Sequence, residues 1–288
     1  MVKVGFLGTG LMGQPMAQRL LDAEIPVVAY NRTSSKLESL KDSGAETTDS
    51  AADAIAAADC VILMLADADA IRQVALSDSC QEVLKGCTVI QMGTISPRQS
   101  QDIQNQIVAV GGEYLEAPVL GSIPQVKDGK LQVMVGASED QFQKWQELLK
   151  NFGEPLLIGP VGTAAATKLA LNQLIAALTA GFALSLGFVK RQGVDVDKFM
   201  ELLRDSALYA PTFDKKLNRM QDSNFADPNF PLKHLLKDIN LFLSEAKAEG
   251  LEASSLAGVR QVVEKAKDAG LADEDYSSLY SGIAQTLG

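Results

Sequence analysis

The sequence predicts an α/β protein, with a doubly wound, mainly parallel sheet in an N-terminal domain and a long helix leading into an all-α C-terminal domain. Two observations predict this fold class. Up to about residue 160, short apolar runs alternate with segments of helical periodicity, which is typical of a parallel sheet covered by helices on both faces. Beyond Gly162 no strand pattern recurs, and helical periodicity continues. We therefore expect domains at residues 1–161 and 162–288.

The individual elements follow from local patterns. The expected strands are short runs rich in Val, Ile and Leu, and the expected helices carry apolar residues three and four positions apart. A proline at position 97 fits the first turn of a helix. Strands are expected at residues 2–7, 26–30, 60–65, 87–92, 114–117, 131–136 and 156–158. Helices are expected at residues 14–23, 35–43, 51–58, 68–75, 96–110, 142–149, 164–191, 196–204, 213–220, 232–248, 254–269 and 276–285.

Composition indicates an ordinary globular protein and argues against several functional classes. Apolar residues make up 47% and charged residues 22% of the chain, and the net charge of −10 disfavours a nucleic acid or an anionic membrane as partner. The uncharged run at residues 169–189 could span a bilayer, but its Asn172, Gln173 and Thr179 favour a buried helix. With three cysteines, no C-x-x-C pair and one histidine, we expect a reduced, cytoplasmic protein without a metal site.

Three glycines follow the first strand at G-x-G-x-x-G spacing, and a helix follows them. In this context Gly8 permits a tight turn, Gly10 lets the backbone approach a pyrophosphate, and Gly13 lets helix and strand pack closely. The helix N-terminus then offers N–H groups and a positive dipole end to phosphates. The motif predicts a Rossmann-type dinucleotide site, the alternative being a glycine-rich turn. The expected cofactor contacts here are Gly8, Thr9, Gly10, Leu11, Met12, Gly13 and, at the end of a later strand, Leu65.

The turn after the second strand indicates which dinucleotide is bound. A site for NAD(H) usually carries an acidic residue here, to bind the ribose 2′-hydroxyl. This chain instead has Asn31, which would not repel a 2′-phosphate, followed by Arg32 and by the hydroxyls of Thr33 and Ser34. The pattern favours NADP(H), the alternative being a solvated turn that caps the next helix.

Lys168 and Asn172 are the main candidates for chemistry. They lie four residues apart on one face of the long helix, and Lys168 is almost the only charge in that helix. A lysine there is either an end residue with its ammonium in water or a functional group. In a cleft between two domains it would donate a proton to the oxygen of a carbonyl that receives a hydride, with Asn172 orienting the lysine or binding the substrate.

Two turns add candidates for binding a small substrate. Thr94 follows a strand at the sheet edge where ligands bind in open α/β folds. Gly121 and Ser122 follow a later strand and could present N–H groups to a carboxylate. The alternative for each is ordinary turn chemistry.

Together these blocks resemble the β-hydroxyacid dehydrogenase family over nearly the whole chain. A further block, Phe230-Pro-Leu-Lys-His234 with Lys237-Asp238, is most similar to the glyoxylate/succinic semialdehyde reductase branch, as is the Asn31-Arg32-Thr33 turn. The four main blocks are Gly5-Phe-Leu-Gly-Thr-Gly-Leu-Met-Gly13, Gly93-Thr-Ile-Ser-Pro97, Glu116-Ala-Pro-Val-Leu-Gly-Ser122 through Gly129, and Gly162 to Asn172 with its Lys-x-x-x-Asn.

The resemblance implies a role for each matching residue. Lys168 matches the catalytic lysine of the family and Asn172 its companion, while Thr94 matches a residue near the nicotinamide and the substrate. Lys237 matches a lysine on the cofactor side of the cleft, and Phe230 and Asp238 match active-site positions of the reductase branch. The family fold is a Rossmann domain plus a helical domain, usually assembled as homodimers or homotetramers.

One position departs from the family pattern. Where the Ala-Pro-Val block usually continues with a serine that contacts substrate, this chain has Leu120, so either Ser122 and backbone amides replace it or the substrate is longer or less polar. We expect NADPH-dependent reduction of small aldehydes carrying a carboxylate, such as glyoxylate or succinic semialdehyde. The alternatives are 3-hydroxyisobutyrate dehydrogenase activity in the oxidative direction, an imine-reductase relative, and a catalytically silent NADP-binding module.

Overall fold

The computed structural model describes residues 2–284, and the chain divides into two compact units. The first unit ends at Lys168 and the second begins at Leu169, inside the long helix α9 (Thr163–Arg191). This division lies seven residues beyond the boundary expected at 161 and 162. The first turn of α9 is hydrogen-bonded to Glu116 of the first unit.

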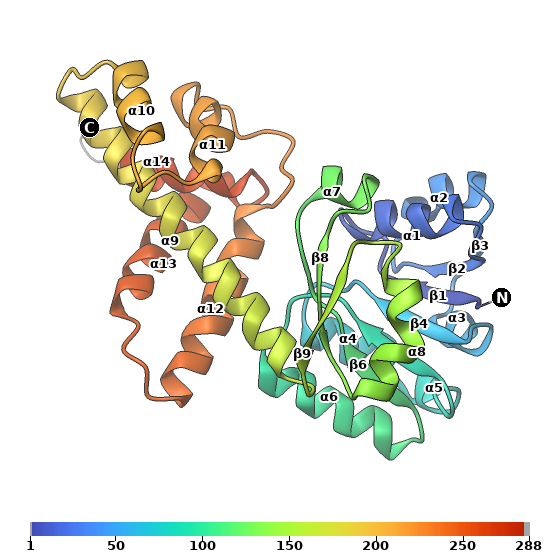
Figure 1. Ribbon diagram of the computed structural model, residues 1–288. Helices are drawn as coiled ribbons and strands as arrows, with labels where there is room; N and C mark the ends of the chain where they lie inside the picture. Colours follow the sequence, from blue (N-terminus) through green and yellow to red (C-terminus); the bar gives the residue numbers. More distant parts are fainter. Residues whose placement is uncertain (1, 285–288) are drawn as a thin grey trace. The chain divides into compact units, whose positions relative to one another are not determined.

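In the described part of the chain, the first unit contains a nine-stranded sheet in the order β3-β2-β1-β4-β5-β6-β8-β7, with β9 paired to β8 (Figure 1). The first six strands of this order, from β3 through β2, β1, β4 and β5 to β6, are parallel, whereas β8 is antiparallel to β6 and β7. This confirms the predicted doubly wound, mainly parallel sheet. The strands are β1 (Val4–Leu7), β2 (Val27–Tyr30), β3 (Glu46–Thr48), β4 (Cys60–Leu63), β5 (Thr88–Gln91), β6 (Glu113–Glu116), β7 (Val119–Leu120), β8 (Gln132–Gly136) and β9 (Pro155–Gly159).

Helices cover both faces of the sheet, and each face has its own apolar core. Because side chains alternate along a strand, Phe6 of β1 enters one core and its neighbour Leu7 the other. The core with Phe6 also contains Trp145, the one tryptophan of the chain. The helical segments of this unit are α1 (Gly13–Asp22), η1 (Ser34–Leu37), α2 (Glu38–Asp42), α3 (Ala51–Ala56), α4 (Ala68–Ala75), α5 (Asp78–Gln81), α6 (Pro97–Ala109), α7 (Ile123–Lys127) and α8 (Glu139–Leu149).

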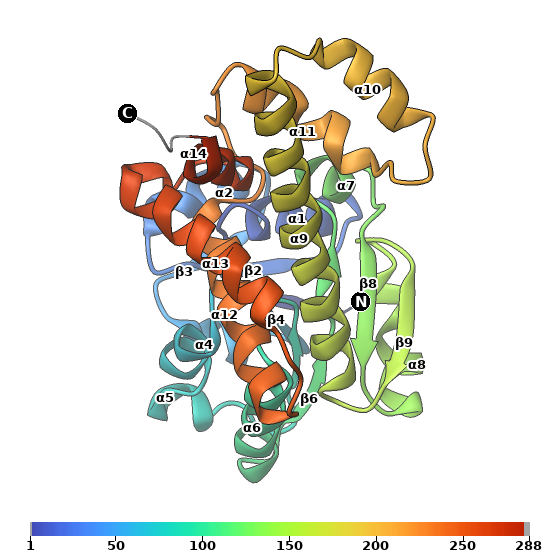
Figure 2. The same ribbon diagram turned by 90° about the vertical axis from the view of Figure 1, so that its left-hand side faces the viewer.

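The second unit is helical, and its core forms around the C-terminal part of α9. Ala176, Ala183 and Leu186 of α9 are buried there, and Phe182 stacks on Phe213 of α11 with ring centroids 4.8 Å apart. Figures 1 and 2 both show α10 and α11 beside this part of α9. The helical segments are α10 (Val196–Arg204), α11 (Pro211–Gln221), α12 (Leu232–Ala248), α13 (Ser254–Ala266), η2 (Lys267–Leu271), η3 (Tyr276–Ser278) and α14 (Leu279–Ala284).

Helix α9 is also long and apolar enough to cross a membrane, judged by length and composition alone. Its buried positions belong to the protein core, and three of them carry polar side chains, those of Lys168, Asn172 and Thr179. A core helix of this kind meets the same criterion as a membrane span, so the criterion does not distinguish the two.

The structure differs from the expected elements mainly in short segments. Strands β3 and β7 and helices α5 and α7 were not expected, because each has five residues or fewer and so shows no clear period. The helix expected at 35–43 is a 3₁₀ turn followed by α2, and the helix expected at 254–269 ends at Ala266, before a turn in which Gly270 has a φ of 88°. The last expected helix reaches Gln285, which lies outside the described residues.

Candidate active site

The glycine loop between β1 and α1 forms a concave surface, called the cradle here, with open space above its second glycine, Gly10. Gly8 has a φ of 101°, and a Cβ there would lie 2.5 Å from the carbonyl oxygen of Met64. A Cβ on Gly13 would overlap the carbonyl oxygen of Gly8, whereas a Cβ on Gly10 would meet no atom within 4 Å. Gly8 and Gly13 are therefore needed for packing, and the space above Gly10 is open. This is the division of roles that a pyrophosphate-binding loop requires, so the cradle fits a dinucleotide.

The loop also presents hydrogen-bond donors at the start of α1. Helix α1 has no side-chain cap, and its first turn has no acidic residue that would compete with a phosphate. Within residues 2–284, the N–H groups of Leu11 and Met12 make no hydrogen bond. Thr9 is buried, and its hydroxyl donates to the carbonyl oxygen of Lys36 at 3.3 Å. The donors that a bound phosphate needs are thus placed at the positive end of a helix.

The turn after β2 is tied directly to this loop. The N–H of Thr9 donates to Oδ1 of Asn31 at 3.1 Å, and Nδ2 of Asn31 donates to the carbonyl oxygen of Thr33 at 3.0 Å. The side chains of Arg32 and Thr33 are exposed, and Thr33 makes no capping bond to η1. The amide of Asn31 therefore joins the two loops and leaves Arg32 and Thr33 at the surface beside them.

Two further strands of the first unit end at the same edge of the sheet. Leu65 follows β4 rather than ending it, and its side chain lies against Gly8 while its carbonyl oxygen lies against Gly93. The amide of the buried Gln91 binds both backbone groups of Gly93, at 2.6 Å and 3.0 Å. This places the half-buried Thr94 just beyond the end of β5. The structure thus brings together the glycine loop, the Asn31 turn, Leu65 and Thr94.

In the loop at Gly121 and Ser122, the two donors of Ser122 are already used within the turn. Gly121 has a φ of 138°, and Ser122 precedes α7. Both the N–H and the hydroxyl of Ser122 donate to Oε1 of Gln125, at 2.9 Å and 2.8 Å. These two groups are used within the turn, so the predicted contact of Ser122 with a substrate carboxylate requires Gln125 to move. Leu120, in β7, is half-buried.

A buried carboxylate that the sequence analysis left without a role holds the start of α9. Glu116 ends β6 and is 1% exposed, and its Oε1 accepts hydrogen bonds from the N–H groups of Gly162, Ala164 and Ala165. Its other oxygen is bound by the hydroxyl of Ser100. Burial raises the pKa of Glu116, and these hydrogen bonds oppose the rise. The backbone N–H groups that it binds lie 46 to 49 positions further along the chain, so no local signal in its sequence block marks the role.

Lys168 and Asn172 are buried on one face of α9, with exposed fractions of 8% and 3%. In the second unit, Nδ2 of Asn172 donates to Oδ2 of the buried Asp238 at 2.7 Å. Because only the nitrogen of the amide can donate to a carboxylate, Oδ1 of Asn172 points away, and within residues 2–284 it has no hydrogen-bond partner. Lys237 pairs with the same aspartate, with Nζ 3.1 Å from Oδ1 of Asp238.

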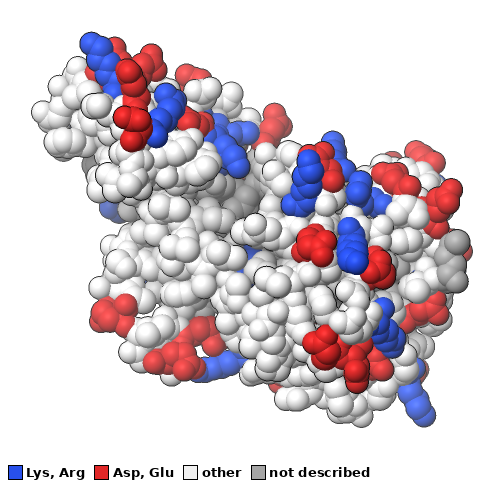
Figure 3. Space-filling model, in the orientation of Figure 1, with Lys and Arg blue, Asp and Glu red and all other residues white. Residues whose placement is uncertain are grey.

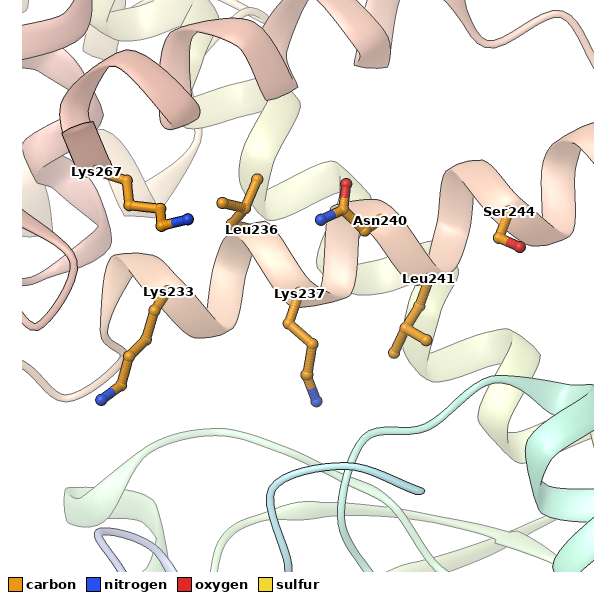
Figure 4. Close-up of a pocket in the computed structure, with 7 residues that line it drawn as sticks. All are labelled: Lys233, Leu236, Lys237, Asn240, Leu241, Ser244 and Lys267. Atoms are coloured by element: carbon orange, nitrogen blue, oxygen red, sulfur yellow. The ribbon is translucent and has the colours of Figure 1, made fainter. Parts of the chain in front are cut away.

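The remaining predicted residues of the second unit lie on or before α12. Phe230 is half-buried and packs against His234 and edge-on against Tyr276, with centroid distances of 6.5 Å and 5.6 Å. Lys237 lines a shallow groove along α12, where Figure 4 shows it projecting to the same side as Lys233. The groove is lined by Lys233, Leu236, Lys237, Asn240, Leu241, Ser244 and Lys267.

The charges on one face of the molecule and the metal-ligating types of side chain among the described residues bear on other classes of ligand. On the face drawn in Figure 3, basic side chains alternate with acidic ones, and broad uncharged areas separate them. Among residues 2–284, no group of three or more His, Cys, Asp or Glu side chains is arranged to hold a metal ion.

Comparison with known proteins accounts for nearly the whole chain. Residues 3–163 match the NAD binding domain of 6-phosphogluconate dehydrogenase, and residues 162–283 match the NAD-binding region of NADP-dependent 3-hydroxyisobutyrate dehydrogenase. Glyoxylate/succinic semialdehyde reductase 2, chloroplastic, of Arabidopsis thaliana is 32% identical over 98% of this chain and 79% of its own. The 2-hydroxy-3-oxopropionate reductase of Escherichia coli is 30% identical over 98% of this chain and 97% of its own.

A solved structure shares the fold. The 3-hydroxyisobutyrate dehydrogenase of Salmonella typhimurium superposes with a TM-score of 0.87, over 98% of this chain and 99% of its own, at 22% sequence identity.

Proposed function

From the membership of this chain in the β-hydroxyacid dehydrogenase family, whose members are NAD(P)-dependent oxidoreductases acting on CH–OH groups, we propose a specific reaction. The protein reduces small aldehydes that carry a carboxylate, with NADPH as cofactor. Glyoxylate and succinic semialdehyde are the proposed substrates. The observation that carries the proposal is the buried pair of Lys168 and Asn172, one helical turn apart. The names of the two relatives near 30% identity support the substrate class, because each names an aldehyde that carries a carboxylate.

The cofactor would be held by the cradle in the first unit. Backbone N–H groups at Leu11 and Met12 would bind its pyrophosphate, above the open space at Gly10. When bound, the reduced nicotinamide supplies a hydride to the carbonyl carbon of the aldehyde. Arg32 and the hydroxyl of Thr33 would bind the 2′-phosphate, because both side chains are exposed beside the loop.

Lys168 supplies the proton in the proposed reduction. As negative charge develops on the carbonyl oxygen, the ammonium of Lys168 donates a proton to that oxygen and completes the hydroxy acid. Asn172 assists because its free Oδ1 accepts a hydrogen bond, either from the lysine or from the new hydroxyl. Asp238 holds the amide of Asn172 in the orientation that leaves Oδ1 available. Thr94 would contact the substrate from the end of β5.

A second candidate function is oxidation of 3-hydroxyisobutyrate or a related hydroxy acid. The match of residues 162–283 to the 3-hydroxyisobutyrate dehydrogenase region favours it. In that direction Lys168 would accept the proton of the hydroxyl instead of donating one. Leu120 bears on the choice, since a leucine there cannot hydrogen-bond a hydroxyl or carboxylate, and the pocket would then favour a longer or less polar substrate.

The first experiment follows nicotinamide absorbance with purified protein. NADPH and NADH are each offered with glyoxylate, succinic semialdehyde and methylglyoxal, and NADP⁺ and NAD⁺ with 3-hydroxyisobutyrate. Lys168→Ala is tested beside Lys190→Ala, an exposed lysine near the other end of the same helix. We expect turnover of an aldehyde acid with NADPH, lost in Lys168→Ala and kept in Lys190→Ala. Turnover of the hydroxy acid alone would favour the second function. Cofactor binding without turnover of any of these compounds would point to an untested substrate, with Leu120 the first residue to substitute.

We also propose that the protein is a homodimer in which α9 pairs with its copy. One exposed stripe of α9 is uncharged, small at its N-terminal end and large at its C-terminal end, so an antiparallel copy would place small residues against large ones. This stripe is defined as Ala166, Ala170, Leu174, Leu178, Gly181, Leu184 and Phe188. A tetramer would add a second interface elsewhere.

A reducing compartment, the cytoplasm, suits the cysteines. Cys60, Cys80 and Cys87 are all free and buried. Burial raises the pKa of each thiol, in Cys87 to about 11, so none of them ionises near neutral pH. We propose that they serve only as small apolar core residues.

A further inference from the structure

The buried carboxylate of Glu116, at the end of β6, has no part in the reaction proposed above, yet α6, β8 and the start of α9 converge on it. Its Oε1 lies 2.8 Å, 2.9 Å and 3.1 Å from the backbone nitrogens of Gly162, Ala164 and Ala165. Three donors on one oxygen attach the start of α9 to the end of β6. The positive end of the helix favours a negative charge at this point.

The second oxygen of Glu116 accepts a hydrogen bond from a buried hydroxyl. The hydroxyl of Ser100, in α6, binds it, and that hydroxyl is 2.8 Å from the hydroxyl of the buried Tyr114. On the third side is Gly136 of β8, where a Cβ would overlap Oε1 of Glu116. The chain therefore leaves room for this carboxylate and orients both of its oxygens.

This contact differs from the other helix caps of the first unit. Ser50, Ser96 and Ser138 each cap the helix that directly follows them in sequence, so they fix a helix end only relative to its own loop. Glu116 precedes the residues it binds by 46 to 49 positions and belongs to the sheet. It therefore fixes where α9 begins relative to the sheet edge that carries Thr94.

We propose that Glu116 is a positioning residue for Lys168. Lys168 follows Ala165 by three residues, so about one turn of helix separates the ammonium-bearing residue from the anchored N–H groups. Shortening the side chain of Glu116 by one methylene would shift the first turn of α9 by about 1 Å, which is enough to misplace a proton donor. The inference rests on the proposed function, in which Lys168 donates the proton.

The test compares two substitutions of Glu116 that differ in reach. Glu116→Asp shortens the side chain by one methylene, and we expect kcat to fall roughly 10- to 100-fold with the KM for NADPH within about 2-fold of the wild type. Glu116→Gln keeps the reach and one acceptor oxygen, and we expect it to keep kcat within about 3-fold. Glu113→Asp, at an exposed position that begins the same strand, is the matched control and leaves kcat unchanged.

Two further variants separate positioning from stability. Ser100→Ala removes only the hydroxyl that orients the carboxylate and should lower kcat about 3- to 10-fold, even if Glu116→Asp folds poorly. In a Lys168→Ala background, Glu116→Asp should cause no further loss of the residual rate, because the residue through which it acts is absent.

The outcomes distinguish the two proposals. Two results would overturn the positioning role alone. One is a wild-type kcat in both folded Glu116→Asp and Ser100→Ala. The other is that Glu116→Asp lowers the rate by the same factor in the presence and in the absence of Lys168. An equal loss of kcat in Glu116→Gln and Glu116→Asp would also overturn it, since reach would then not matter. Full activity of Lys168→Ala would overturn the proton-donor role, and this inference with it.

Discussion

The side chain of Asn31 accepts one hydrogen bond and donates another, and an aspartate could make only the first. Its oxygen accepts from the N–H of Thr9, and its nitrogen donates to the carbonyl oxygen of Thr33. An aspartate has no donor for the second bond and would add a negative charge beside the proposed 2′-phosphate site. Asn31 thus supports NADPH binding both by holding the turn and by remaining neutral.

Arg32 is the residue whose removal tests the cofactor choice. We expect Arg32→Ala to raise the KM for NADPH roughly 10- to 100-fold, since a charge-assisted bond to phosphate is worth about 1.5–3 kcal/mol. The KM for NADH should stay within about 2-fold, because that cofactor lacks the phosphate. Lys41→Ala, an exposed lysine of α2, is the control. Equal effects on both cofactors would show that Arg32 does not bind the phosphate.

His234 makes stability depend on pH in a predictable direction. Burial is the main cause that lowers the pKa of this side chain from its ordinary 6.5, and the positive charge of Lys237 adds to it. Below pH 6.5 the unfolded chain therefore binds the proton more readily than the folded protein, and the free energy of unfolding falls as pH drops. Urea unfolding between pH 7 and pH 5 should show a smaller fall for His234→Asn than for the wild type. Parallel curves would contradict this.

At the scale of elements, two glycines of the loop between β1 and α1 have different roles. Gly10 leaves space for a ligand, and Gly13 allows close packing within the protein. Gly10→Ala places a methyl group in open space, so we expect an unchanged melting temperature and a cofactor Kd at least about 10-fold weaker. Gly13→Ala drives a methyl group into the carbonyl oxygen of Gly8 and should lower the melting temperature itself. Calorimetry and cofactor titration of both variants check this. Tight binding by Gly10→Ala would argue against a pyrophosphate above Gly10.

The sequence was most informative where structure depends on near neighbours. The glycine spacing predicted the β1–α1 loop, and four-residue spacing placed Lys168 and Asn172 on one face of α9, because both patterns are local. The bond from Asn172 to Asp238 joins residues 66 positions apart, and the bond from the N–H of Ala165 to Glu116 spans 49 positions. Such pairs are set by tertiary packing, so no periodicity indicates them. Strand β3 was missed for a related reason, since its three residues take their extended form from pairing with β2.

At the scale of the whole molecule, the exposed stripe of α9 predicts the oligomeric state. Leu184 and Phe188 are 62% and 63% exposed, and we expect the wild type to be a dimer that Phe188→Glu converts to a monomer. A buried unpaired charge in an apolar interface costs several kcal/mol, which is sufficient to dissociate it. Val108→Glu, at an exposed apolar position of α6, should leave the dimer intact. Light scattering after size exclusion measures the mass, and a monomeric wild type would refute the proposal.

The position of Trp145 has a consequence for watching this protein unfold. It is the one tryptophan in the chain and lies, 4% exposed, in a core of the first unit. Its emission therefore reports the melting of the nucleotide-binding unit alone, while circular dichroism at 222 nm is weighted toward the helical second unit. If the two units unfold as one, both signals change at the same denaturant concentration. If they unfold separately, the fluorescence and the ellipticity change at different denaturant concentrations. The measurement needs no attached label.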